Sequence, residues 1–192
     1  AAVSNGDIPL KFTADIHEVT YTRVAGNGFE ENDEVGVFAL VGSSTMKEER
    51  YADNLRFFRT SEKVFESSEP IYYPDDEVTL CLISYYPYQE EGVNMGESTM
   101  SVAVETDQNL SAGYFCSDFL VASQNLQSAP KGAIALHYDH KFFKLKIALV
   151  GKEGEELQGI LDADPKLSVC GFYTKAIYDF QKETYSAFSN EK

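Results

Sequence analysis

An alternation of apolar and polar residues with a period of two is the feature that most constrains the fold of this chain. Between Asp7 and His17, apolar side chains recur at every second position, at Ile8, Leu10, Phe12, Ala14 and Ile16. Successive side chains of a strand point to opposite faces, so this pattern predicts a β-strand with one buried face. Similar patterns predict further strands at residues 34–41, 77–88, 98–105, 132–140 and 141–150.

Turn-rich segments separate these patterns and set the fold class. Gly, Asn, Pro and acidic residues gather at positions 25–33, 73–77, 88–98 and 128–132. Many short strands with such punctuation are typical of an antiparallel sandwich or barrel, so we expect an all-β fold. Helical periodicity is scarce, and the best candidates are residues 43–54 and a shorter turn within 117–125.

The character of the chain changes after Val150, where a charged, glycine-bearing segment begins. Further strands are predicted at residues 166–176 and 177–188, with a hairpin-like turn at residues 181–184. Roughly 40 residues are too few to bury an independent sandwich core. We therefore predict a β domain over residues 1–150, with residues 151–192 forming either the start of a second β domain or a C-terminal strand appendage.

Composition excludes several classes of function. The 192 residues include 16 Lys and Arg against 31 Asp and Glu, a net charge of −15, which repels nucleic acids and anionic lipid surfaces. No stretch approaches the roughly 20 apolar residues of a membrane span. The first residues have neither a basic start nor an apolar core, so we expect a processed or trimmed chain without a signal peptide. The three cysteines match no CxxC metal or redox motif.

The usual catalytic motifs are absent, so we expect no enzyme, cofactor or metal centre. His137 and His140 should face opposite sides of a strand, and the acidic runs 30–34 and 75–77 lack the ligand spacing of a calcium loop. Exposed tyrosines stack on sugars in many lectin-like sites. A candidate aromatic binding surface is therefore formed by Tyr72, Tyr73, Tyr85, Tyr86 and Tyr88. The alternative is that these rings pack the edge of the sandwich.

Several segments, in order along the chain, resemble those of one known family. They are Thr22–Arg23, FEENDEVGVFA (29–39), IYYPDDEVTLCLISYYPY (71–88), CSDFLVAS (116–123) and LHYDHKFFKLKIAL (136–149). Together they resemble the fimbrillin family, the Mfa-like pilin and fimbrial-anchor proteins of Bacteroidetes, over roughly residues 8–150. Residues 169–180 resemble the opening of the family's second domain.

The resemblance implies a fold and a function. It implies transthyretin-like β-sandwich domains, of which the second is short here, and Ser84 stands where Ala is common in the family. It implies an exported outer-membrane lipoprotein, with a lipid anchor upstream of Ala1, that forms part of a fimbria. The implied partners are other fimbrial subunits and a host glycan or protein. The alternative is a glycan- or protein-binding sandwich that does not polymerise.

The resemblance also implies a role for Arg23. In such pilins, an Arg- or Lys-specific protease cuts in the loop after the first strand. That strand leaves, and a strand of another subunit takes its place. Arg23 is therefore a candidate processing site, because it follows the alternating strand and precedes a Gly/Asn loop expected to be exposed. The alternative is an ordinary loop cation that pairs with Glu30, Glu31, Asp33 or Glu34.

Overall fold

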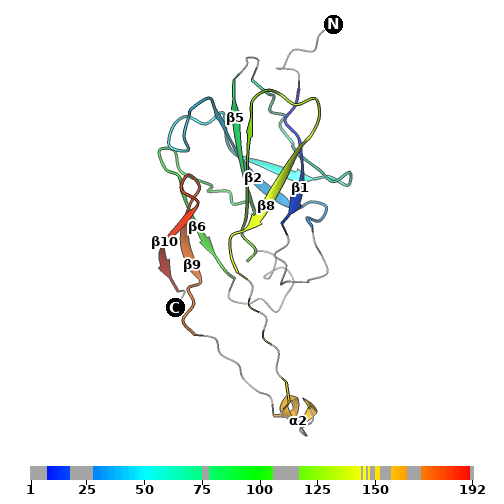
Figure 1. Ribbon diagram of the computed structural model, residues 1–192, viewed down its shortest axis with the longest axis vertical. Coiled ribbons are helices and arrows are strands. Elements are labelled where there is room, and N and C mark those ends of the chain that lie inside the picture. Colours follow the sequence, from blue (N-terminus) through cyan, green and yellow to red (C-terminus); the bar gives the residue numbers. More distant parts are fainter. Residues whose placement is uncertain are drawn as a thin grey trace.

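The computed structural model describes residues 8–17, 28–74, 78–105, 117–143, 145, 147, 150–151, 157–163 and 170–190. Its strands are β1 (Phe12–Ile16), β2 (Glu34–Val41), β3 (Ala52–Arg59), β4 (Val64–Ser67), β5 (Leu80–Tyr86), β6 (Thr99–Ala103), β7 (Leu120–Leu126), β8 (Ile134–His140), β9 (Lys175–Asp179) and β10 (Thr184–Ser189). The helix α2 (Leu157–Asp162) lies apart from the strands in Figure 1. The prediction of an all-β chain is confirmed.

Seven strands close into a barrel in the order β1-β4-β3-β2-β5-β7-β8. Most neighbours are antiparallel, whereas β1 and β8 run parallel and close the barrel, as Figure 1 shows for the blue and yellow strands. The prediction of a purely antiparallel fold is therefore wrong at this pair. A parallel pair needs a long connection, which the chain supplies because β1 and β8 are first and last in the barrel.

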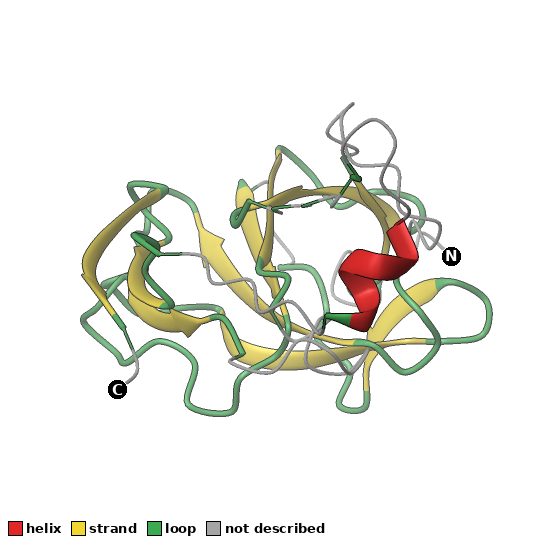
Figure 2. Ribbon diagram, turned by 90° about the horizontal axis from the view of Figure 1, so that it is seen from below, coloured by secondary structure: helices red, strands yellow, loops and turns green. Residues whose placement is uncertain are grey.

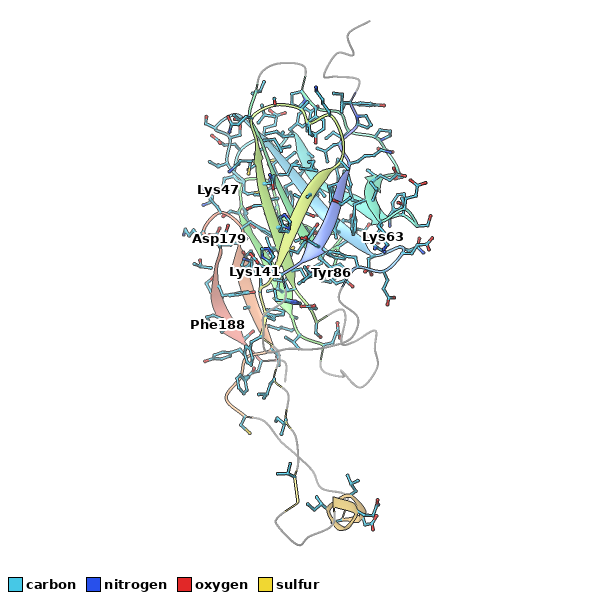
Figure 3. All side chains as sticks on the ribbon, turned by 45° about the vertical axis from the view of Figure 1, so that its right-hand side comes forward. Lys47, Lys63, Tyr86, Lys141, Asp179 and Phe188 are labelled. Atoms are coloured by element: carbon cyan, nitrogen blue, oxygen red, sulfur yellow. The ribbon has the colours of Figure 1, made fainter. Side chains whose placement is uncertain are left out.

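A second sheet, in the order β10-β9-β6, lies beside the barrel. Figure 2 shows it on the side that carries the C-terminus. In Figure 3, Lys63, in the turn between β3 and β4, lies on one side of the molecule. Phe188, on β10, lies on the opposite side. The predicted hairpin turn at residues 181–184 is confirmed, because it joins β9 to β10 as an antiparallel pair.

The described residues form two hydrophobic cores that share three strands. The first fills the barrel and includes Val35, Val37 and Ala39 of β2. The second lies between the barrel and the second sheet, and includes Phe38 and Leu40 of the same strand. β5 and β7 also place residues in both cores. The apolar run of β2 is thus nearly continuous because both of its faces are buried.

Glycine is required where the two cores meet on β2. A Cβ atom placed on Gly36 would lie 2.2 Å from the ring of Tyr85 on the neighbouring strand β5. The Tyr85 ring is fully buried and stacks on Phe38 with the ring centroids 5.8 Å apart. The absence of a side chain at position 36 therefore makes the space that this tyrosine occupies.

Two sequence expectations of helix are wrong. Residues 43–51 form turns, and β3 begins at Ala52, where a helix over 43–54 was expected. Residues 120–126 form β7 rather than a helical turn. In both places the local pattern is overridden by packing, because Phe57 of β3 and Leu120 of β7 are buried in the barrel core.

The strand predicted over residues 141–150 is also not found among the described residues of that segment. Phe143, Leu145 and Ile147 are 70%, 53% and 46% exposed, so no neighbouring strand covers the predicted apolar face. None of the described residues forms a helix both long and apolar enough to cross a membrane.

Candidate functional site

The first strand supplies part of the barrel core. Phe12 is fully buried, and its ring stacks on Phe65 and Phe57 with centroid distances of 5.1 and 5.3 Å. Leu10 is also buried. The partly buried side chains that pack against the same core include Ile8, Ala14 and Ile16. All five predicted apolar residues thus face the barrel interior.

The two edges of β1 are bonded unequally. On one edge, residues 12–16 pair in parallel with residues 134–138 of β8. The amide of His17 extends this ladder by donating to the carbonyl of Tyr138 at 2.8 Å. On the other edge, only residues 12–13 pair with residues 64–65 of β4. The β8 seam is therefore the longer continuous contact of the first strand.

Before β1, the chain forms a second short contact on the β4 side. The amide of Leu10 donates to the carbonyl of Ile71 at 2.8 Å, and the amide of Tyr73 donates to the carbonyl of Ile8 at 3.1 Å. An interruption separates this contact from the β1–β4 pairs. It is bridged by the ion pair of Lys11 and Glu66, with Nζ and Oε2 2.6 Å apart.

Two surface clefts flank this interruption. One, of about 310 Å³, is lined by residues of 9–11 and 66–72. The other, of about 500 Å³, is lined by residues of 60–66 together with Lys11 and Ala133. Lys11 and Glu66 border both clefts. The contact between the first strand and the β4 side is thus incompletely filled by side chains.

The outer face of the β1–β8 seam carries four ionisable side chains. The Nδ1 atom of His17 lies 2.8 Å from Oδ1 of Asp139. The Nδ1 atom of His137 is likewise hydrogen-bonded to Asp15. The two imidazole rings stack on each other with centroids 5.5 Å apart and planes within 11°. Each pair joins β1, or the residue that follows it, to β8.

The predicted processing site, Arg23, lies outside the described residues. The acidic run that follows it forms a tight turn, in which the amide of Glu30 donates to Oδ2 of Asp33 at 2.6 Å. Burial is the main cause that raises the pKa of Asp33 above its ordinary value. Glu34 lies 3.6 Å from Arg56 on β3. At least part of the acidic run is therefore engaged by groups other than Arg23.

The structure does not place the five predicted tyrosines on one surface. Tyr73 and Tyr85 are 3% and 0% exposed, and burial raises the pKa of each to about 12. Tyr86 and Tyr88 are partly buried, and Tyr72 is 42% exposed. An aromatic surface that needs Tyr73 and Tyr85 is therefore wrong, because these rings fill the two hydrophobic cores.

A buried arginine was missed by the sequence reading. The side chain of Arg50 is 0% exposed, and its guanidinium carbon lies 5.2 Å from the centroid of the Phe38 ring. It pairs with Asp53 and donates to the backbone carbonyls of Met46, Val93, Asn94 and Glu97. The local pattern does not mark Arg50 as buried, because three of the carbonyls that it binds, those of Val93, Asn94 and Glu97, come from a distant loop.

Among the described residues, no group of three or more His, Cys, Asp or Glu side chains is arranged to hold a metal ion. The site defined by these observations is instead a strand and its two seams. The fold and the site together define an all-β protein whose barrel is completed by its first strand.

A sequence profile of the fimbrillin-like family matches residues 22–192. The match covers most of the chain, so the protein belongs to the fimbrillin-like family. The matched region begins beyond β1, so the first strand lies outside it. A search of curated proteins found no significant match.

Three solved structures from Bacteroides align with this chain, and the one with a TM-score above 0.5 shows a related fold. A candidate cell adhesion protein from Bacteroides uniformis aligns at a TM-score of 0.63 with 18% identity, over 95% of this chain and 68% of that one. A candidate cell adhesion protein from Bacteroides ovatus aligns at 0.49 with 18% identity, over 69% of this chain and 52% of that one. A fimbrial protein from Bacteroides ovatus aligns at 0.41 with 20% identity, over 71% and 28% of the two chains. The present chain thus spans about half of the first Bacteroides ovatus protein and about two thirds of the Bacteroides uniformis protein.

Proposed function

We propose that this chain is a structural subunit, or an accessory or anchor component, of a bacterial surface fimbria that supports cell adhesion. The observation that carries the proposal is the first strand, which completes the barrel of a fimbrillin-like chain and places Phe12 in its core. A strand in that position is suited to exchange, because another strand of alternating pattern can take over its backbone bonds and core contacts.

The proposed assembly step begins with cleavage after Arg23. Loss of residues 1–23 would remove β1 and leave a groove between β4 and β8, floored by Phe57 and Phe65. A strand from another subunit would then fill the groove. The short and interrupted contact with β4 makes that edge the easier one to open.

The energetics favour refilling of the groove. Burial of each large apolar side chain contributes roughly 1.5–3 kcal/mol. Leu10 and Phe12 are both buried, and Ile8 and Ile16 are partly buried. An empty groove would also leave backbone groups of β8 without the partners that β1 provides. A replacement strand recovers both contributions.

Finer features of the family are part of the proposal. The sheet of β6, β9 and β10, packed on β2, β5 and β7, supports a transthyretin-like sandwich organisation. The pairing of β9 with β6 supports residues 151–192 as a strand appendage of the domain over residues 1–150. We place the protein at the cell surface, attached to the outer membrane through a lipid anchor upstream of Ala1.

The experiment is treatment with an Arg-specific protease, followed by intact mass and denaturing electrophoresis of heated samples. The expected result is a cut after Arg23 and a ladder of heat-resistant oligomers. The matched control is Arg23→Ala, which should resist this cut and remain monomeric. A wild-type chain that is cut after Arg23 and stays monomeric would contradict assembly by strand exchange and favour an adhesin that does not polymerise.

A further inference from the structure

The outer face of the β1–β8 seam pairs opposite charges in a regular arrangement. Asp15 lies opposite His137 in the parallel register, and the next outward pair brings His17 to Asp139. In each pair, one side chain comes from β1 or the residue that follows it, and the other comes from β8. The two side-chain contacts therefore link the first strand to β8.

The charges of these contacts depend on pH. Histidine is the side chain that ordinarily changes its charge between pH 5 and 8. With both imidazoles protonated, each cross-strand contact is an ion pair and the four groups sum to zero charge. With both neutral, the seam retains two carboxylates and two weaker hydrogen bonds. Protonation thus strengthens the attraction between β1 and β8.

We propose that Asp15, His17, His137 and Asp139 form a pH-dependent latch that holds the first strand more tightly in acid and loosens it near neutral pH. Its role in regulating assembly rests on the proposed release of the first strand. In that role, the latch would restrict strand exchange in acidic surroundings and permit it near neutral pH.

Other charged and titratable groups lie around the latch. Lys141, which follows β8, places Nζ 3.9 Å from Oδ2 of Asp139 and offers that carboxylate a permanent cation. The phenol of Tyr178 on β9 also interacts electrostatically with Asp139. On the β4 side, Lys11 and Glu66 pair with each other. The other contact of the latch joins Asp15 to His137.

The two rings also repel each other when both are charged, because their centroids lie only 5.5 Å apart. The carboxylates offset this repulsion in the native chain. This gives the arrangement a signature that an ordinary surface ion pair lacks. Removal of the two carboxylates should reverse the effect of pH on the seam rather than abolish it.

The test is hydrogen exchange of the β1 amides in the intact, uncut chain at pH 5.5 and pH 8, after correction for intrinsic exchange rates. Amides of β5, between Leu80 and Tyr86, are the internal reference for global opening. Exposed ion pairs contribute little each, so protection of β1 relative to β5 should be about threefold to tenfold higher at pH 5.5. Addition of 1 M salt should reduce this difference.

Three variants separate the latch from other effects of pH. The double variant His17→Gln/His137→Gln should show the same relative protection at both pH values. The double variant Asp15→Asn/Asp139→Asn should show lower protection at pH 5.5 than at pH 8. The matched control is His140→Gln, because His140 is hydrogen-bonded to Asp118, and it should behave like the wild type.

Equal protection of wild-type β1 at the two pH values would overturn the proposal. So would a pH difference that persists in His17→Gln/His137→Gln. Because the chain is intact, the measurement gives its answer whether or not Arg23 is cleaved and whether or not oligomers form. Failure of the latch and failure of the proposed assembly are therefore distinguished.

Discussion

Substitution of Phe12 by alanine tests whether the first strand is an integral part of the core. Phe12 is fully buried, and its ring lies nearly parallel to Phe65, with 5° between the planes, while also contacting Phe57. Removal of a buried phenylalanine ring typically costs 3–5 kcal/mol, and more when the cavity cannot collapse. Phe12 lies opposite Phe65 of β4 and Ile134 of β8, so its backbone is held between two strands. We therefore expect Phe12→Ala to lower the free energy of unfolding by about 4 kcal/mol.

The assay is equilibrium unfolding in urea, with the midpoint and the slope fitted separately. A fall in the midpoint at constant slope measures lost stability. A domain of this size is ordinarily stable by about 5–15 kcal/mol, so the variant should still fold. The matched control is Thr13→Ala, because Thr13 is the adjacent, exposed residue of β1 and should lose less than about 1 kcal/mol. A loss below about 1.5 kcal/mol for Phe12→Ala would refute the packing argument.

Two further predictions concern groups buried away from the first strand. Arg50→Lys should lower the free energy of unfolding by about 3 kcal/mol, because one ammonium group cannot reach all the carbonyls that the guanidinium binds. The control, Arg56→Lys at an exposed site, should change the free energy of unfolding little in the same urea assay. Burial raises the pKa of Tyr73 and Tyr85 to about 12, so their contribution to stability is complete below the ordinary value near 10 and is lost as the pH rises from about 10 to 12. Phenolate absorbance at 295 nm and far-ultraviolet circular dichroism should accordingly change together, and titration near pH 10 with the circular dichroism retained would contradict the burial.

Much of the strand content could be predicted from local pattern alone. The alternation between Ile8 and Ile16 indicated a strand with one buried face, and the hairpin at residues 181–184 followed from its polar turn between apolar runs. These features depend only on residues close in sequence. The same local reasoning failed at residues 43–54, where a helix was expected, because β3 is stabilised by its pairing with β2 and β4.

The candidate site could be predicted in part. The sequence indicated the first strand and its core-facing residues, whereas Arg23 stays a prediction because it lies outside the described residues. The sequence did not distinguish buried from exposed tyrosines, because Tyr72 and Tyr73 are neighbours with opposite surroundings. It also did not indicate the latch, because His17 and Asp139 are separated by 122 positions.

The sequence by itself determined an acidic, all-β chain with short strands and a first strand that presents one apolar face. These properties follow from composition and from the twofold period of side chains along a strand. Only the tertiary structure decided that β1 lies parallel to β8, that β2 is buried on both faces, and that Asp15 and His17 meet His137 and Asp139. The physical reason is that strand pairing joins segments far apart in the chain, and its register follows from the packing of both cores together rather than from any one segment.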